Sequence, residues 1–103
     1  MKLFLISDNT DTLMGMRLAG IEGVYCRTKE DAEAEIHKAV ADPGIGILLI
    51  TAKLTRLCHD LIVDRKLNYK RPLIEEIPDR HTSKGILTSL ERYVSDAVGI
   101  KLE

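Results

Sequence analysis

The chain has 103 residues, of which 45% are hydrophobic and 30% are charged, and its formal net charge is −1. This composition is typical of one ordinary globular domain and excludes disordered and membrane-spanning proteins. Because 15 basic residues are balanced by 16 acidic ones and no basic run stands out, charge gives no reason to expect nucleic-acid binding. The N-terminal residues enter a strand pattern at once, without a signal peptide, and no apolar run approaches a membrane span. We therefore expect a cytosolic protein.

The first half of the chain alternates apolar runs of strand type with segments of helical period. In chain order, the pattern predicts a strand at 2–7, a helix at 10–19, a strand at 23–26, a helix from 29 to 41 and a strand at 45–50. Thr10 is the expected N-cap of the first helix, and Gly20 is its expected C-terminal stop. Thr28 is the expected cap of the second helix. The run at 45–50 lacks alternation, which favours a central parallel strand covered on both faces.

The second half of the chain predicts one more helix, one more strand and a detached C-terminal helix. The inner stripe of the third helix, which closes near residues 66–68, comprises Leu54, Leu57, Cys58, Leu61 and Ile62. A fourth strand at 72–77 opens with Pro72 and carries Glu75 and Glu76, features that favour the edge of a sheet. The polar segment that follows reads as a hinge, and residues 86–98 again have helical period.

These elements predict an α/β fold with a small, open, four-stranded parallel sheet. The order βαβαβαβ is that of flavodoxin-like and receiver-like domains, and here a C-terminal helix follows a polar hinge. We expect an α/β globular domain at 1–78, a hinge at 79–85, and a C-terminal helix and tail at 86–103.

An acidic turn follows the first predicted strand, at the sheet edge where open α/β domains bind their ligands. Asp8 and Asp11 stand there, as in a phosphoacceptor receiver domain, but the third strand ends in Thr51 where such a domain has its phosphorylated Asp. Capping of the short helix is therefore the favoured role of the two carboxylates, and a cation site is the weaker interpretation. The turn also lacks the glycine patterns that bind nucleotide phosphates. A receiver-like or flavodoxin-like switch for a small ligand or for phosphorylation remains the alternative function.

The remaining reactive side chains predict no catalytic site, metal or cofactor. Cys26 and Cys58 are 32 residues apart in the chain, with no CxxC pattern, which favours buried free thiols over a disulfide or a zinc site. His37 and His59 fall within charged helix surfaces, and His81 falls in the hinge. Surface placement is the favoured interpretation of all three histidines.

The C-terminal helix carries the most informative pattern. Its apolar residues recur at three-four spacing and form a narrow stripe, which is typical of a coiled-coil seam rather than of a helix lying on a sheet. The stripe consists of Leu87, Leu90, Val94, Ala97 and Val98, with Tyr93 on its flank. Two heptads do not support a coiled coil alone, so the stripe either folds back on its own domain or joins a longer partner helix. The polar hinge favours the partner.

Four motifs of this chain, in this order and spacing, resemble the F subunit of the V-type and archaeal-type rotary ATPases. They are DTLMGMRLAGI (11–21), GIGILLIT (44–51), PLIEEIP (72–78) and AVGIKL (97–102), of which the first and third are the more specific. The resemblance runs across nearly the whole chain. The sequence departs from the family pattern at Glu75, where an apolar residue is usual, at Asp79, where Gly is frequent, and at Ala52, where Glu often follows the Thr.

This resemblance implies a non-catalytic subunit of the central rotor stalk. In that family the C-terminal helix binds the long helical hairpin of the D subunit, so the resemblance implies that the stripe and Tyr93 contact that hairpin. It points to the membrane-side stalk subunit (C/d) as a second candidate partner. It also implies a protein that is peripheral to the membrane and helps couple ATP turnover to ion transport.

Overall fold

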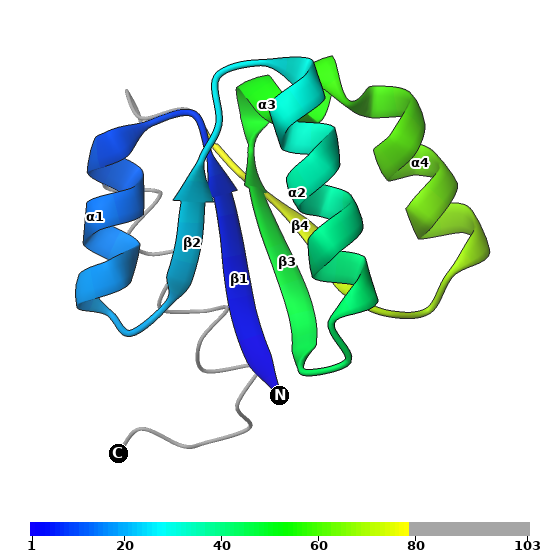
Figure 1. The fold of residues 1–103 in the computed structure, drawn as a ribbon, viewed down its shortest axis with the longest axis horizontal. Coiled ribbons are helices and arrows are strands. Elements are labelled where there is room, and N and C mark those ends of the chain that lie inside the picture. Colours follow the sequence, from blue (N-terminus) through cyan, green and yellow to red (C-terminus); the bar gives the residue numbers. More distant parts are fainter. Residues whose placement is uncertain (79–103) are drawn as a thin grey trace.

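The computed structural model describes residues 1–78, which form one parallel α/β domain (Figure 1). Its elements in chain order are β1 (Lys2–Ser7), α1 (Thr10–Leu18), β2 (Glu22–Tyr25), α2 (Lys29–Ala41), β3 (Ile45–Thr51), α3 (Ala52–Leu57), α4 (His59–Asn68) and β4 (Leu73–Ile77). The predicted fold class is confirmed. The predicted hinge (79–85) and C-terminal segment (86–103) lie outside the described residues.

The sheet has the strand order β2-β1-β3-β4, and all three strand pairs are parallel. The predicted central position of the third strand is confirmed, because β3 pairs with both β1 and β4. Leu48, Leu49 and Ile50 have no exposed surface, as expected for a strand covered on both faces. The fourth strand is an edge strand, as its proline and paired glutamates predicted.

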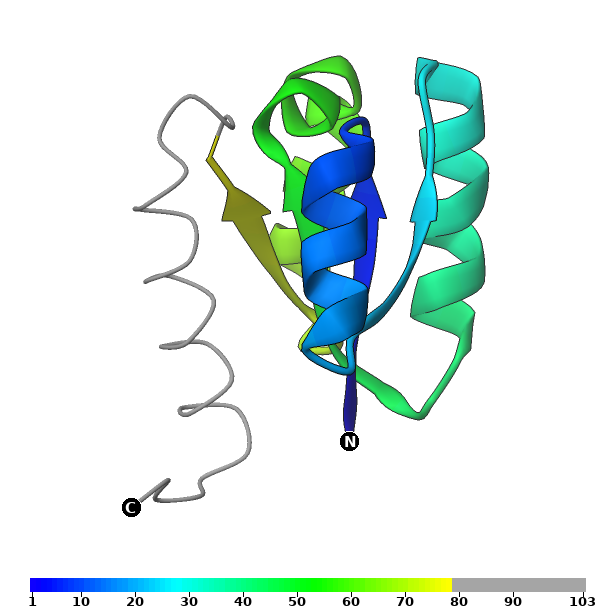
Figure 2. The same ribbon diagram turned by 90° about the vertical axis from the view of Figure 1, so that its left-hand side faces the viewer.

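Helices cover both faces of the sheet. Figure 1 shows the strands between α1 on one side and α2, α3 and α4 on the other; in Figure 2, α1 stands in front of the strands and α2 beside them. Under α1, Leu13 and Met16 pack with Leu5 and Leu49. Under the other helices a larger cluster gathers around Ile6, Leu48 and Ile50, and its helical members are Ala32, Ile36, Ala39, Leu54, Cys58 and Ile62.

The ends of the first two helices are fixed by local hydrogen bonds. The predicted cap of the second helix is confirmed, since the Thr28 side chain accepts a hydrogen bond from the Asp31 N–H at 3.1 Å. The predicted cap of the first helix was wrong by one residue. Asn9 is the N-cap, because its Oδ1 accepts from the Thr12 N–H at 3.0 Å, and Thr10 is already helical. Gly20, with φ +87°, ends this helix in the left-handed conformation that glycine adopts readily.

The third predicted helix is two helices in the structure. The chain bends at Cys58, whose backbone (φ −104°, ψ 26°) ends α3 and precedes α4. The apolar spacing did not reveal this bend, because Leu54, Cys58 and Ile62 remain on one inner face through it. Of the predicted inner stripe, Leu57 is instead 40% exposed, since it lies on the outer side of α3 at the bend.

Both cysteines are free and buried, which confirms the prediction of buried thiols. Burial, reinforced by the carboxylates of Glu35 and Asp31, raises the pKa of Cys26 from 9.0 to about 11. Burial also raises the pKa of Cys58. Both thiols are therefore protonated at neutral pH.

The raised pKa of Cys26 predicts a loss of stability at high pH. Between pH 9 and 11 the unfolded thiol loses its proton while the folded thiol keeps it, so the folded state becomes less stable as pH rises. We expect the stability of the wild type relative to Cys26→Ser, which lacks this thiol and keeps Cys58, to fall by about 2 kcal/mol over this range. Urea unfolding of both proteins at each pH measures this difference in the free energy of unfolding. A constant difference would contradict the raised pKa.

Candidate functional site

The ends of β1 and β3 form the place where an open α/β sheet of this strand order binds its ligand, because the chain connections diverge between these two strands. Asp8 follows β1, and Thr51 ends β3. The Thr51 hydroxyl donates a hydrogen bond to Asp8 Oδ1 at 2.6 Å, and the Asp8 N–H donates to Thr51 Oγ1 at 3.2 Å. Thr51 is 5% exposed. These two hydrogen bonds therefore occupy the position where an open α/β sheet usually binds its ligand.

The polar side chains of the turn between β1 and α1 are also engaged in hydrogen bonds within the protein. The Ser7 hydroxyl donates to the Asn9 carbonyl at 2.8 Å and accepts from the Asn9 N–H at 2.9 Å, and Ser7 is fully buried. Asn9 in turn caps α1, and Asp11 stands in the first turn of that helix, where a carboxylate complements the positive helix end. The polar residues of the acidic turn therefore bind the backbone and one another.

Side chains that ligate metals are dispersed over the described domain. Within residues 1–78, no three His, Cys, Asp or Glu side chains come together in a group that could hold a metal ion. His37 and His59 are exposed, and His59 Nδ1 lies 3.5 Å from the Asp60 carboxylate. The surface placement predicted for these two histidines is confirmed, while His81 lies outside the described residues.

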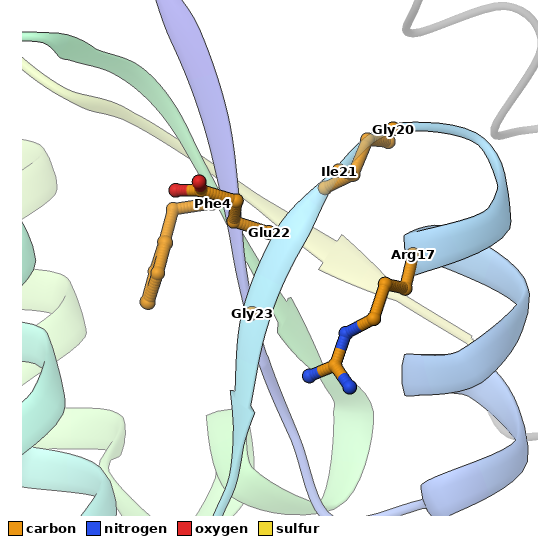
Figure 3. A pocket seen from close by; sticks show the side chains of 6 residues that line it. All are labelled: Phe4, Arg17, Gly20, Ile21, Glu22 and Gly23. Atoms are coloured by element: carbon orange, nitrogen blue, oxygen red, sulfur yellow. The ribbon is translucent and has the colours of Figure 1, made fainter.

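One hollow, with a volume of about 490 Å³, lies at β2, an edge strand of the sheet formed by residues 1–78. Figure 3 shows that its lining residues stand on different sides of the strand: Arg17 reaches from α1 toward one side of β2, and Phe4 lies on the other side. Its remaining lining is Gly20, Ile21, Glu22 and Gly23. One cation and one carboxylate separated by a strand do not converge on a common reacting atom, so the geometry does not define a catalytic site.

The predicted partner-binding residues all belong to the C-terminal segment. Leu87, Leu90, Tyr93, Val94, Ala97 and Val98 lie outside the described residues, so their role stays a prediction. Among residues 1–78, none of the helices is long and apolar enough to cross a membrane.

The fold and its closed strand ends define a class of protein: an open-sheet α/β domain of flavodoxin-like strand order whose usual ligand position is taken up by its own hydrogen bonds. Comparison with known proteins identifies the family. The family model of the ATP synthase (F/14-kDa) subunit matches residues 3–94. The chain belongs to this family.

Relatives from archaea agree with this assignment over all or most of each chain. The F subunit of the A-type ATP synthase of Thermococcus kodakarensis is 31% identical, and the alignment covers 100% of this chain and 99% of the relative. The corresponding protein of Methanocaldococcus jannaschii is 27% identical over 100% of both chains. That of Methanothermobacter thermautotrophicus is 34% identical over 89% of this chain and 88% of its own. This chain is accordingly a subunit of a rotary ATPase and has protein partners.

Proposed function

We propose that this chain is a non-catalytic subunit of the central rotor stalk of an A/V-type ATPase. Its role is to bind the helical hairpin of the D subunit and to help couple ATP turnover to ion transport. The observation that carries the proposal is family membership across nearly the whole chain. It is supported by the strand ends between β1 and β3, where Thr51 occupies the position of a receiver nucleophile and is hydrogen-bonded to Asp8.

The C-terminal stripe is the surface we assign to the D subunit. Leu87, Leu90, Val94, Ala97 and Val98 repeat at three-four spacing, and Tyr93 flanks them. A two-heptad stripe of this kind gains stability by packing against a longer helix, and a helical hairpin supplies one. Transmission of torque requires an interface that remains bound while the rotor turns, and burial of a continuous apolar stripe provides it.

Charge insertion into the stripe tests this assignment. We expect Leu90→Asp with Val94→Asp to weaken the one-to-one complex with purified D subunit about 1,000-fold, because two buried carboxylates replace two apolar contacts of the interface. The complex is measured by size exclusion and by titration. Thr88→Asp with Ser95→Asp is the matched control, since it adds the same charge to the polar side of the same segment. A complex that survives the first pair of substitutions would exclude the stripe as the D-binding surface.

The rest of the proposal concerns the place of the subunit in the complex. It is peripheral to the membrane on the cytoplasmic side, and its second candidate partner is the membrane-side stalk subunit (C/d). No catalytic residue or cofactor is assigned to it, because coupling by a stalk subunit is mechanical. Purification of the complex from native membranes, followed by mass spectrometry, identifies which stalk subunits accompany the chain.

A further inference from the structure

Positive charge is concentrated in the last turn of α4 and in the segment that joins α4 to β4. Residues 65–71 carry Arg65, Lys66, Lys70 and Arg71 and no acidic residue, so this segment has a formal charge of +4 and the rest of the chain −5. In the sequence the four cations are interrupted by Leu67, Asn68 and Tyr69, and they therefore do not form a run. In the fold they gather where α4 ends and β4 begins, at the end of the sheet opposite to the Asp8–Thr51 hydrogen bonds (Figure 1).

The two arginines, Arg65 and Arg71, each contact other residues of the domain. Arg71 Nη1 donates to the Pro43 carbonyl at 2.9 Å and to the Ile45 carbonyl at 3.4 Å, which ties the turn to the start of β3. The Arg65 guanidinium lies 3.6 Å from the centre of the Tyr69 ring, in cation–π contact. Tyr69 is thereby held in place beside the two lysines, although its side chain is 51% exposed.

The two lysines, Lys66 and Lys70, are exposed. Within residues 1–78, no carboxylate lies within ion-pair distance of Lys66 or Lys70, whereas Lys2 and Lys38 each have such a partner. The Asp64 carboxylate, close by on α4, accepts a hydrogen bond from the Asn68 side chain at 2.8 Å instead. Two cations are thus left available to an acidic group from outside the domain.

A hollow of about 300 Å³ adjoins these lysines, and its lining combines polar and apolar surface in similar amounts. Tyr69, Leu73 and Ile74 contribute apolar surface, and Lys66 and Lys70 stand with them in the lining. Leu67 and Leu73 are exposed at 77% and 54%. Exposed aromatic and aliphatic side chains beside exposed cations are the composition of an interface with a polar rim.

We propose that this basic corner, made of Lys66, Tyr69, Lys70 and Leu73, is a docking surface for an acidic segment of a neighbouring polypeptide. Carboxylates of the partner pair with Lys66 and Lys70, while an apolar side chain of the same segment enters the hollow against Tyr69 and Leu73. The surface uses none of the residues of the C-terminal stripe, so it is a second attachment point in addition to the proposed D-binding helix.

Two observations favour a polypeptide over a phosphate group. Tyr69 and Leu73 in the lining offer apolar contact that a phosphate cannot use, and Pro72 contributes no N–H to bind one. A segment with both carboxylates and an apolar side chain complements the lysines and the hollow together.

The first test uses the assembled ATPase purified from native membranes. A carbodiimide joins a lysine amine to a carboxylate in direct contact, and mass spectrometry locates the joined residues. We expect Lys66 and Lys70 to be joined to Asp or Glu of another subunit. Products that join these lysines only to carboxylates of this chain, or to none, would overturn the proposal. Loss of the D complex in the stripe variant bears only on the C-terminal helix, so the two results are separable.

The second test is charge reversal. We expect Lys66→Glu with Lys70→Glu to weaken retention of this subunit in the complex 10-fold to 100-fold and to shift its release to lower salt. Lys66→Arg with Lys70→Arg retains binding, and Lys29→Glu with Lys53→Glu, at two other exposed lysines, is the control of equal charge change. Unchanged release of the charge-reversed protein contradicts the proposal. Sedimentation with phosphatidylglycerol-containing vesicles that depends on Lys66 and Lys70, without joining to another subunit, reassigns the corner to lipid and also overturns it.

Discussion

Replacement of Gly23 by alanine is expected to lower the free energy of unfolding by about 2–3 kcal/mol, because β2 has no room for a side chain at this position. A Cβ atom there would lie 2.7 Å from the Leu5 carbonyl oxygen, 2.8 Å from Leu13 Cδ1 and 2.9 Å from Leu5 Cβ. The first of these atoms is backbone of the neighbouring strand and cannot rotate away. Either α1 or the pairing of β2 with β1 must shift. Guanidinium unfolding, followed by circular dichroism, measures the loss.

Gly15 offers a matched control on the helix that packs over the same strands. It lies within α1, is exposed, and has no atom within 4 Å of the position of an added Cβ. Gly15→Ala is therefore expected to raise the free energy of unfolding by about 0.5–1 kcal/mol, since alanine loses less backbone freedom on folding. Equal effects of the two substitutions would show that close packing of α1 on β2 does not require a glycine at position 23.

Replacement of Thr51 by aspartate is expected to destabilise the domain by about 2–4 kcal/mol at pH 7. Thr51 Oγ1 lies 2.6 Å from Asp8 Oδ1, so the substitution places two carboxylates against each other where Thr51 is almost fully buried. Two like charges at this separation repel by several kcal/mol in a partly buried site, and the hydrogen bond to Asp8 is also lost. The measurement is urea unfolding at pH 7.

The pH dependence of this effect separates repulsion from a change of shape. Repulsion raises the pKa of the carboxylate pair in the folded state, so the penalty is present above the unfolded pKa near 4 and disappears as pH falls below it. Thr51→Asn, a neutral side chain of the same size as aspartate, is the reference at each pH. We expect the two variants to differ at pH 7 and to converge near pH 3. A difference independent of pH would rule out charge repulsion as the cause.

The architecture could be predicted from the sequence because its strongest patterns are long and consistent. The unbroken apolar run of β3 predicted a central strand, and Pro72 with the glutamates of β4 predicted an edge. The replacement of the receiver nucleophile by Thr51 was also visible in the sequence. The hydrogen-bond partner of Thr51 could not be predicted, because Asp8 is 43 positions away in the chain and the hydrogen bond depends on the sheet pairing.

Local features that depend on one backbone angle or one side-chain contact could not be predicted in this way. Asn9 and Thr10 are both acceptable caps by residue type, and only the bond from the Thr12 N–H selects Asn9. The bend at Cys58 keeps the helical period of the buried residues on either side, so apolar spacing carries no sign of it.

The two proposed binding surfaces also differ in how far the sequence could predict them. The C-terminal stripe has a clear period, yet Leu90 and its neighbours lie outside the described residues, so the assignment stays a prediction. The basic corner has no sequence pattern of its own. Lys66 belongs to a helix and Lys70 to a turn, and only the path of the chain from α4 to β4 places them beside Tyr69 and the hollow.

The parallel pairing of β4 with β3 has a mechanical consequence for the proposed role in a rotor stalk. β4 is paired in register with β3 along its whole length, from Leu73 to Ile77. A tensile force that acts on residue 78 along the strand axis loads the backbone hydrogen bonds between β3 and β4 in shear, so that all of them resist the force at once. The same force directed across the sheet would peel them apart one at a time, beginning at Ile77. The anchorage of the tail is thus strongest when the pull follows the strand.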